Sequence, residues 1–338
     1  MSPQSRVTID DVADLAGVSI ATVSRVLNNT GKVATTTAER VRAAIDELDY
    51  VPHAGARGLA GSRRNTIGLV FPGMGDAFLT ELLIGIDQEL TDAGFELLLY
   101  STRLRNRDGS HLPIPLGEHN TDGLIVFAGS LKDAEIRRFY EGGSPVVLLH
   151  QSAPEGMTIP SVTFENKAGA QTAVSHLIQC GRQQIVYLAG PEGNEDSHWR
   201  ESGYREALAA NNLPVVPELI TFGDFNDTVA ETAVTQLLQS GVEFDAIFAG
   251  DDRSARGALF ALQQAGKQVP EDVAVVGFDD ASYARYLTPP LSTIHAPIEE
   301  SGRKAAEQII RLIQGKKADL LTLLPTELIV RESCGGEN

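Results

Sequence analysis

The chain has 338 residues, of which 42% are hydrophobic, 22% charged and only 6% aromatic, as in an ordinary globular protein of two or three domains. The formal net charge of −17 argues against a general polyanion binder. No run approaches the about 18 apolar residues of a membrane span, and the opening MSPQSRVTID lacks the apolar core of a secretory signal.

The charge is unevenly distributed along the chain. Residues 1–64 carry eight Lys or Arg against seven acidic residues, whereas the remainder carries 20 against 38. A local DNA-contacting module near the N-terminus is therefore compatible with the acidity, because phosphate attraction acts within about 8 Å. The two cysteines, Cys180 and Cys334, lie far apart in the sequence, and we expect unpaired thiols in a reducing cytoplasm.

Three helices are predicted within the first fifty residues. The first begins after Thr8, which forms a capping-box pattern with Asp11, and it ends at Gly17, which tolerates a left-handed conformation. Ser19 is a suitable N-cap for the second helix, and residues 35–50 have the apolar spacing of a third. Two short helices, a tight turn and a supporting helix indicate a helix-turn-helix.

The second helix has small and polar residues opposite its apolar face. In a helix-turn-helix this helix lies in the major groove. Small side chains at Ala21 and Thr22 allow close approach, hydroxyls can donate to phosphates, and Arg25 is long enough to reach guanine. The residues of this segment expected at DNA are Ser19, Ile20, Ala21, Thr22, Ser24, Arg25 and Asn28. A three-helix bundle whose polar face is only solvated remains the alternative.

Residues 51–64 are predicted to fold only conditionally. Pro52 can open a helix, but Gly55 and Gly58 each cost about 1 kcal/mol relative to alanine, and the segment is too short to be stable as an isolated helix. We therefore expect it to become helical when something holds it, with Leu59 wedged between base steps from the minor groove. The alternative is a flexible linker with an incidental leucine.

From Thr66 onward, short apolar runs alternate with amphipathic stretches. This alternation predicts parallel sheets covered by helices on both faces, and nine strands predict two lobes. The strands are expected at 66–71, 95–100, 123–128, 145–149, 184–190, 219–222, 246–250, 273–278 and 292–294. The helices are expected near 77–93, 131–141, 166–180, 199–212, 226–240, 254–266 and 297–314.

Polar residues follow several of these strands, at the carboxyl ends where such sheets bind ligands. Carboxylates accept hydrogen bonds from hydroxyl groups, arginine donates hydrogen bonds to oxygen atoms, and an aromatic ring packs against C–H groups. Together these residue types suit a hydroxyl-rich ligand such as a sugar. The candidates are Asp76, Phe78, His150, Arg200, Phe225, Asp251 and Asp279. Each aspartate can instead cap a helix, and we expect one member of each pair, Asp251–Asp252 and Asp279–Asp280, to cap while the other faces the ligand.

Several segments resemble the lactose/galactose repressor (LacI/GalR) family: TIDDVADLAGVSIATVSRVLNNTGKV, ELDYVPHAGARGLAG, NTIGLVFP, RESGY and VVGFDD. The resemblance covers residues 6–334 and implies an all-α helix-turn-helix headpiece with a two-lobed α/β body like that of periplasmic binding proteins. It implies a cytoplasmic homodimer, or a tetramer of dimers, that binds a pseudo-palindromic operator and a small-molecule effector. It implies no membrane association, and we expect no cofactor or metal.

Carried over by position, the resemblance assigns Ile20 and Ala21 to base reading, Leu59 to intercalation, Arg200 to the ligand and Phe225 to stacking. The full set expected at DNA is Thr8, Ser19, Ile20, Ala21, Thr22, Ser24, Arg25, Asn28, His53, Ala56, Arg57 and Leu59. The expected domains are a headpiece (1–50), a hinge (51–64), an N-terminal lobe (65–163 and 295–323) and a C-terminal lobe (164–294 and 324–338).

Three places depart from the family pattern. His150 stands where Asp-Arg usually follows its strand, which puts one ligand contact in question. Ala34 and Ala38 replace the usual Ser and Arg around the third helix, removing a cap and a phosphate contact. Pro113 and Pro115 occupy a segment that is usually an amphipathic helix.

The expected function is a repressor that a sugar effector releases from its operator. The alternative within the family is a co-repressor-type regulator, whose ligand, such as a nucleobase or sugar phosphate, strengthens DNA binding. The sequence argues against an exported sugar-binding protein, since no signal precedes the helix-turn-helix. It also argues against an enzyme, since it has no nucleophile elbow, metal-ligand spacing or Walker motif, and GMGDAF has Phe78 in place of a third glycine.

The marginal hinge generates the first prediction. Gly58→Ala should strengthen operator binding and blunt induction, because alanine lowers the cost of forming the helix by about 1 kcal/mol. Operator titration at fixed salt, with and without effector, measures both effects. Equal operator affinity in the variant and the parent would contradict the prediction.

Overall fold

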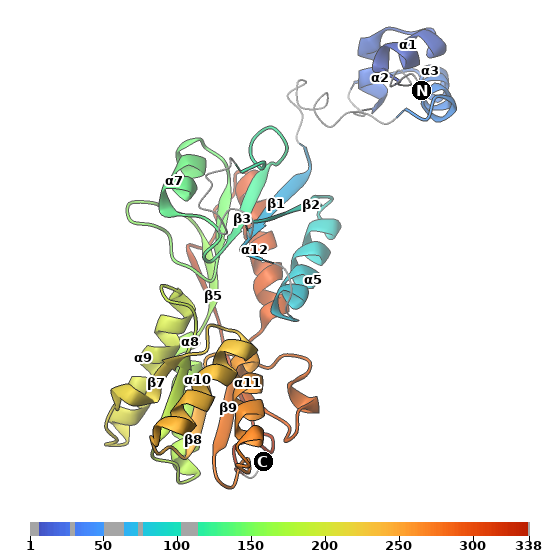
Figure 1. Ribbon diagram of the computed structural model, residues 1–338. Helices are drawn as coiled ribbons and strands as arrows, with labels where there is room; N and C mark the ends of the chain where they lie inside the picture. Colours follow the sequence, from blue (N-terminus) through green and yellow to red (C-terminus); the bar gives the residue numbers. More distant parts are fainter. Residues whose placement is uncertain (1–6, 28–30, 51–63, 74–76, 103–113, 337–338) are drawn as a thin grey trace. The chain divides into compact units, whose positions relative to one another are not determined.

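The structure is a computed structural model that describes residues 7–27, 31–50, 64–73, 77–102 and 114–336. The chain divides into two compact units, Met1–Arg64 and Asn65–Asn338 (Figure 1). The first is helical, and the second is built from parallel sheets covered by helices. This confirms the predicted fold class.

The described residues of the N-terminal unit form a three-helix assembly. Its helices are α1 (Ile9–Ala16), α2 (Ile20–Leu27) and α3 (Thr35–Glu47). Val12, Val23 and Val41, one from each helix, are fully buried against one another. The short helices are therefore stabilised by this shared core, as helices of about eight residues must be.

The predicted capping signals of this unit are confirmed at some positions and corrected at others. The Thr8 amide donates to the Asp11 carboxylate over 2.7 Å, completing a capping box, and Gly17 ends α1 at φ 63°. Ala34 precedes α3 without a side-chain cap, as its sequence predicts. The third helix ends at Glu47 rather than continuing to Tyr50.

The first sheet of the larger unit has the strand order β11-β5-β4-β3-β1-β2, all parallel. Its strands are β1 (Thr66–Phe71), β2 (Glu96–Ser101), β3 (Gly123–Phe127), β4 (Val146–Leu149), β5 (Ser161–Phe164) and β11 (Leu321–Leu324). Successive residues alternate between two hydrophobic clusters, as strand geometry requires. One face packs against α5 (Ala77–Asp92) and α12 (Ile298–Ile313), and the other against α7 (Asp133–Glu141).

The second sheet has the order β12-β10-β9-β8-β6-β7, parallel except for the antiparallel pair β10–β12. Its strands are β6 (Ile185–Ala189), β7 (Ile220–Phe222), β8 (Ala246–Ala249), β9 (Ala274–Asp279), β10 (Ser292–His295) and β12 (Glu327–Ile329). One face is covered by α8 (Asn166–Gln179) and α9 (Glu195–Ala210), and the other by α10 (Asp227–Ser240) and α11 (Asp252–Gln264). Two short 3-10 helices lie at Pro217–Leu219 and Ala284–Tyr286.

The two sheets define two lobes, and the chain passes between them three times. It crosses after Phe164, after His295, and between Leu324 and Glu327. Figure 1 shows the red helix α12 beside α5 in the lobe of the first sheet, although the two are far apart in sequence. Ligand-driven movement of one lobe against the other would therefore concentrate at these three connections.

The predicted strand list was incomplete. Nine strands were expected, whereas the described residues contain twelve, the additional ones being β5, β11 and β12. These strands have only three or four residues, and β11 and β12 lie at sheet edges, so they lack a long apolar run. Helix α9 also begins at Glu195 rather than near residue 199, because Asn194 caps it.

The two cysteines, distant in sequence, approach the same imidazole. His176 Nε2 lies 3.2 Å from Cys334 Sγ and 3.7 Å from Cys180 Sγ, and both thiols are free. Burial lowers the pKa of His176 and raises the pKa of Cys180, so it favours the uncharged forms of these two side chains. Within the described residues, no helix has the length and apolarity needed to cross a membrane.

The contact between α5 and α12 generates a prediction. A Cβ added at Gly85 would lie 1.9 Å from the carbonyl oxygen of Glu299, so Gly85→Ala must push the two helices apart. We expect the free energy of unfolding to fall by about 2 kcal/mol, even though alanine favours a helix. Urea unfolding measures this, with Gln88→Ala on the exposed side of α5 as the control. Equal stability of the two variants would contradict the proposed close packing.

Candidate functional site

One face of helix α2 is largely exposed to solvent. Ile20 is 46% exposed, Ala21 and Arg25 are also exposed, and Val23 behind them is fully buried. The turn before this helix is fixed by Arg40, whose guanidinium donates to the carbonyl oxygens of Ala16 and Gly17. A solvent-exposed isoleucine beside an arginine on a rigidly held helix is suited to contacting the base edges of a DNA groove.

The hydroxyl groups around α2 have local partners. Ser19 Oγ lies 3.0 Å from Thr22 Oγ1 and accepts weakly from the Thr22 amide, so Ser19 caps this helix as expected. Thr8 Oγ1 donates to Asp11 over 2.8 Å, which gives Thr8 a clear structural role at the start of α1. Ser24 is partly buried. The other candidate DNA-contacting residues, Asn28, His53, Ala56, Arg57 and Leu59, lie outside the described residues.

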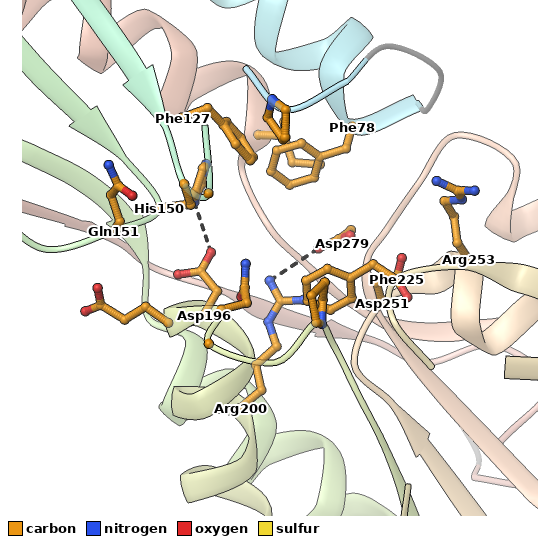
Figure 2. Close-up of a pocket in the computed structure, with 18 of the residues that line it drawn as sticks. Phe78, Phe127, His150, Gln151, Asp196, Arg200, Phe225, Asp251, Arg253 and Asp279 are labelled. Atoms are coloured by element: carbon orange, nitrogen blue, oxygen red, sulfur yellow. Dashed lines mark ion pairs between the residues drawn. The ribbon is translucent and has the colours of Figure 1, made fainter. Parts of the chain in front are cut away.

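A cavity of about 560 Å³ lies between the two lobes, within the range of small-molecule sites. It is lined at the carboxyl ends of the strands, by residues from both sheets and from the starts of α5, α9 and α11. Six of the seven predicted ligand residues line it: Phe78, His150, Arg200, Phe225, Asp251 and Asp279 (Figure 2). The seventh, Asp76, lies outside the described residues.

Arg200 is the central polar group of this cavity. Its guanidinium is 3% exposed and donates to Asn166 Oδ1 over 2.8 Å and to the carbonyl oxygen of Gly250. It also lies 3.6 Å from Asp279 Oδ1 and 3.7 Å from the centre of the Phe278 ring. A planar donor fixed on several sides keeps one orientation, which suits it to bind paired oxygens of a ligand.

Several lining residues adopt backbone conformations that are unusual for residues with side chains. Phe225 has φ 48°, His150 has φ 59° and Asp279 has φ 108°. All three lie at or just beyond the end of a strand, and the Phe225 ring occupies the space in which a Cβ at Gly190 would stand. Backbone strain of this kind persists where the surrounding structure enforces it, and it is concentrated at ligand sites.

His150 and Asp196 form a buried pair across the cavity (Figure 2). His150 Nδ1 lies 3.1 Å from Asp196 Oδ2, and Thr163 donates to the other carboxylate oxygen over 2.9 Å. Burial raises the pKa of Asp196, but His150, Arg200 and the hydrogen bonds outweigh it and hold the pKa below its usual value. The charged carboxylate is therefore the stable form in this cavity.

The two aspartate pairs do not divide their roles as predicted. Asp251 both caps α11, accepting from the Ser254 amide over 2.9 Å, and lines the cavity. Asp252 instead accepts from Thr293 over 2.6 Å, and burial raises its pKa to about 8. In the second pair Asp279 lines the cavity, but Asp280 caps none of the described helices.

Asp280 instead pairs with Arg331 over 2.6 Å, and its Oδ2 lies 3.3 Å from His295 Nδ1. The expectation that one aspartate of each pair caps a helix while the other faces the ligand was wrong, because it allowed each carboxylate only one of these two local roles. In the structure, burial brings partners from distant segments of the chain, which no local spacing reveals.

The sequence reasoning missed Asp196 and Phe127 as lining residues. Phe127 ends β3, and its ring centre lies 5.3 Å from that of His150. Asp196 is in the first turn of α9, four residues before Arg200. Applying the strand-end rule to every residue of these two segments, rather than to the most polar ones, would have found both.

Comparison with known proteins agrees with both the helical N-terminal unit and the two-lobed body. Residues 8–53 match the model of bacterial regulatory proteins of the lacI family, and residues 174–334 match that of the periplasmic binding protein-like domain. The HTH-type transcriptional regulator CelR of Thermobifida fusca is 34% identical, over 98% of this chain and 100% of that protein. The chain belongs to the LacI family.

Two solved structures of LacI-family regulators resemble this chain over nearly its whole length. The complex of the transcriptional regulator CelR with cellobiose has a TM-score of 0.70 at 32% identity, covering 97% of this chain and 100% of that one. The Lac repressor dimer bound to operator and the anti-inducer ONPF has a TM-score of 0.81 at 27% identity, covering 98% and 99%. This LacI-family chain is therefore a DNA-binding transcriptional regulator and not an enzyme.

The His150–Asp196 pair generates a prediction. His150→Ala leaves a buried carboxylate without its main partner and should lower the free energy of unfolding by about 3 kcal/mol at pH 7. Since the lowered pKa of Asp196 stabilises the folded state only above its unfolded value of 3.8, the difference should shrink as the pH falls below that value.

Urea unfolding between pH 3 and pH 7 measures this effect. His198→Ala, at an exposed position on the same helix as Asp196, is the matched control. A pH-independent difference between His150→Ala and the parent would mean that His150 contributes packing and not charge pairing.

Proposed function

We propose that this regulator is a repressor that binds its operator through α2 and is released by a sugar bound between its lobes. The observation that carries the proposal is the fixed guanidinium of Arg200, placed among carboxylates and aromatic rings in a cavity between the lobes. Such a site supplies donors, acceptors and apolar ring faces together, which hydroxyl-rich ligands require.

The relatives support this assignment of the two sites. One solved relative is in complex with cellobiose, and another is bound to operator. By position and exposure, we propose Ile20, Ala21 and Arg25 as base-reading residues. We propose Ser19, Thr22 and Ser24 as phosphate contacts. Thr8, Asn28, His53, Ala56, Arg57 and Leu59 complete the proposed DNA set.

We also propose that the chain acts as a homodimer on a pseudo-palindromic operator, in the cytoplasm. Edge strand β2 and helix α5 carry exposed apolar side chains: Leu98 and Leu99, on the two faces of the strand, are 37% and 38% exposed, and Ile84 on α5 is 49% exposed. An apolar edge of this kind is suited to pairing with a second copy, since a two-fold interface buries the same patch on both partners. A tetramer would require a further surface.

The proposed division of the chain assigns a separate task to each segment. The headpiece (1–50) reads DNA, the hinge (51–64) folds when DNA and the body hold it, and the lobes (65–163 with 295–323, and 164–294 with 324–338) sense the ligand. Effector binding shifts the paired N-terminal lobes and separates the hinges. A coupling of about 1–3 kcal/mol would change operator affinity by roughly 5- to 150-fold.

Operator titration with and without neutral sugars tests the direction of this coupling. Release of the operator supports the proposal. Stronger operator binding in the presence of ligand would make the chain a co-repressor-type regulator and would contradict release.

The position of Arg25 on α2 generates a prediction for the DNA site. Arg25→Ala should weaken operator binding by about 1–3 kcal/mol and relax specificity at one base pair, because it removes a side chain placed to contact a base. Fluorescence anisotropy at fixed salt measures the loss. Arg205→Ala, which removes an exposed arginine from the other unit, should bind operator like the parent. Parental affinity in Arg25→Ala would contradict the assignment.

A further inference from the structure

We infer that the cavity selects an uncharged saccharide and rejects phosphorylated or carboxylated sugars. This inference rests on the proposed function and specifies its effector. It is carried by the charge of the cavity, the engagement of its cations, the capping of two adjoining helices and the position of its aromatic rings.

The charge of the cavity is strongly negative. Among the described residues, seven carboxylates line it against two guanidinium groups, those of Arg200 and Arg253. An anionic ligand would meet net repulsion in a partly enclosed space, where charges are poorly screened. A hydroxyl-rich neutral ligand meets none, and its hydroxyls can donate to carboxylates, which only accept.

Both guanidinium groups already have partners within the protein. Arg200 is held by Asn166, by the carbonyl oxygen of Gly250 and by Asp279. Arg253 lies 3.7 Å from Asp227. A phosphate or carboxylate would therefore compete with anionic groups of the chain itself, whereas a hydroxyl can share the guanidinium with Asp279.

The N-termini of two helices at the cavity, α9 and α11, are also engaged. Such N-termini favour anions when their amides are free. In this chain Asn194 caps α9 by accepting from the Ser197 amide over 2.8 Å, and Asp251 caps α11 by accepting from Ser254. Acidic residues also occupy the first turn of each helix. The N-termini of α9 and α11 therefore offer little attraction to a ligand anion.

The charged forms of two carboxyl groups in the cavity, Glu81 and Asp251, are already disfavoured. Burial raises the pKa of Glu81, and the nearby Asp280 raises it further. Burial also raises the pKa of Asp251. A further negative charge placed beside them would disfavour these charged forms further, so the titration of these groups agrees with the geometry.

Aromatic rings stand on both walls of the cavity. Phe78 and Phe127 come from the lobe of the first sheet, and Phe225 comes from the other lobe (Figure 2). Aromatic rings can pack against the C–H faces of a sugar, but they provide neither a hydrogen-bond donor nor a positive charge for a phosphate. The apolar walls therefore favour the same ligand class that the carboxylates favour.

Calorimetric titration of the full chain with matched pairs of ligands tests the inference. The panel consists of glucose, ribose and cellobiose with glucose 6-phosphate, ribose 5-phosphate and cellobionate, at constant ionic strength. We expect at least one neutral saccharide to bind, and its anionic counterpart to bind at least about tenfold more weakly. The inference is overturned if an anionic member binds as tightly as its neutral counterpart, or if no neutral member binds.

A charge-neutralising variant tests the cause. In Asp133→Asn combined with Glu192→Gln, two exposed lining carboxylates are lost, so the ratio of neutral to anionic affinity should fall several-fold. Glu231→Gln, on α10 and away from the cavity lining, should leave the ratio unchanged. An unchanged ratio in the double variant would overturn the electrostatic explanation.

Operator binding separates this inference from the proposed function. If an anionic sugar releases the operator as well as a neutral one does, the inference fails and the repressor assignment stands. If the parent chain without ligand fails to bind any operator, the proposed function itself fails.

Discussion

The buried guanidinium of Arg200 is the group around which the ligand cavity is organised. A charge that is 3% exposed is stable only when its donors are satisfied, and here Asn166, Gly250 and Asp279 satisfy them. These partners come from the first crossing, from the end of β8 and from the end of β9. One side chain therefore ties a connection between the lobes to the strand ends that line the cavity.

The two halves of the chain solve opposite recognition problems. The headpiece of this DNA-binding regulator presents small residues, an exposed isoleucine and an arginine on a nearly neutral unit, a surface that a polyanion can approach. The body carries a large negative charge and a carboxylate-lined cavity, which are the basis of the inferred rejection of anionic ligands. The net charge of the whole chain therefore comes almost entirely from the body, and it gives no information about the charge of the headpiece.

Local signals in the sequence were sufficient for much of the fold. The capping box at Thr8, the left-handed Gly17 and the long apolar strands were all predictable, because each depends on residues within one turn or one strand. The strand-end rule also placed Arg200 and Phe225 correctly at a cavity. The short strands β5, β11 and β12 were missed, since their pairing depends on neighbours far away in the chain.

The contacts between the lobes could not be predicted from local sequence either, because they also join residues far apart in the chain. His150 and Asp196 come from different lobes, and nothing near either residue in the sequence indicates its partner. Likewise, a single role was expected for each aspartate, whereas Asp251 both caps and lines the cavity. Sequence patterns identified the polar residues at the site, and tertiary packing decided what each of them binds.

The glycine contact between α5 and α12 has a mechanical consequence. Because Gly85 and Gly302 let the two backbones touch, the lobe of the first sheet has no compressible layer of side chains at this seam. A displacement of α12 where it enters the lobe would therefore be passed directly to α5. A larger residue at either position would push the two helices apart and remove this direct backbone contact, without altering any residue proposed to contact the ligand or DNA.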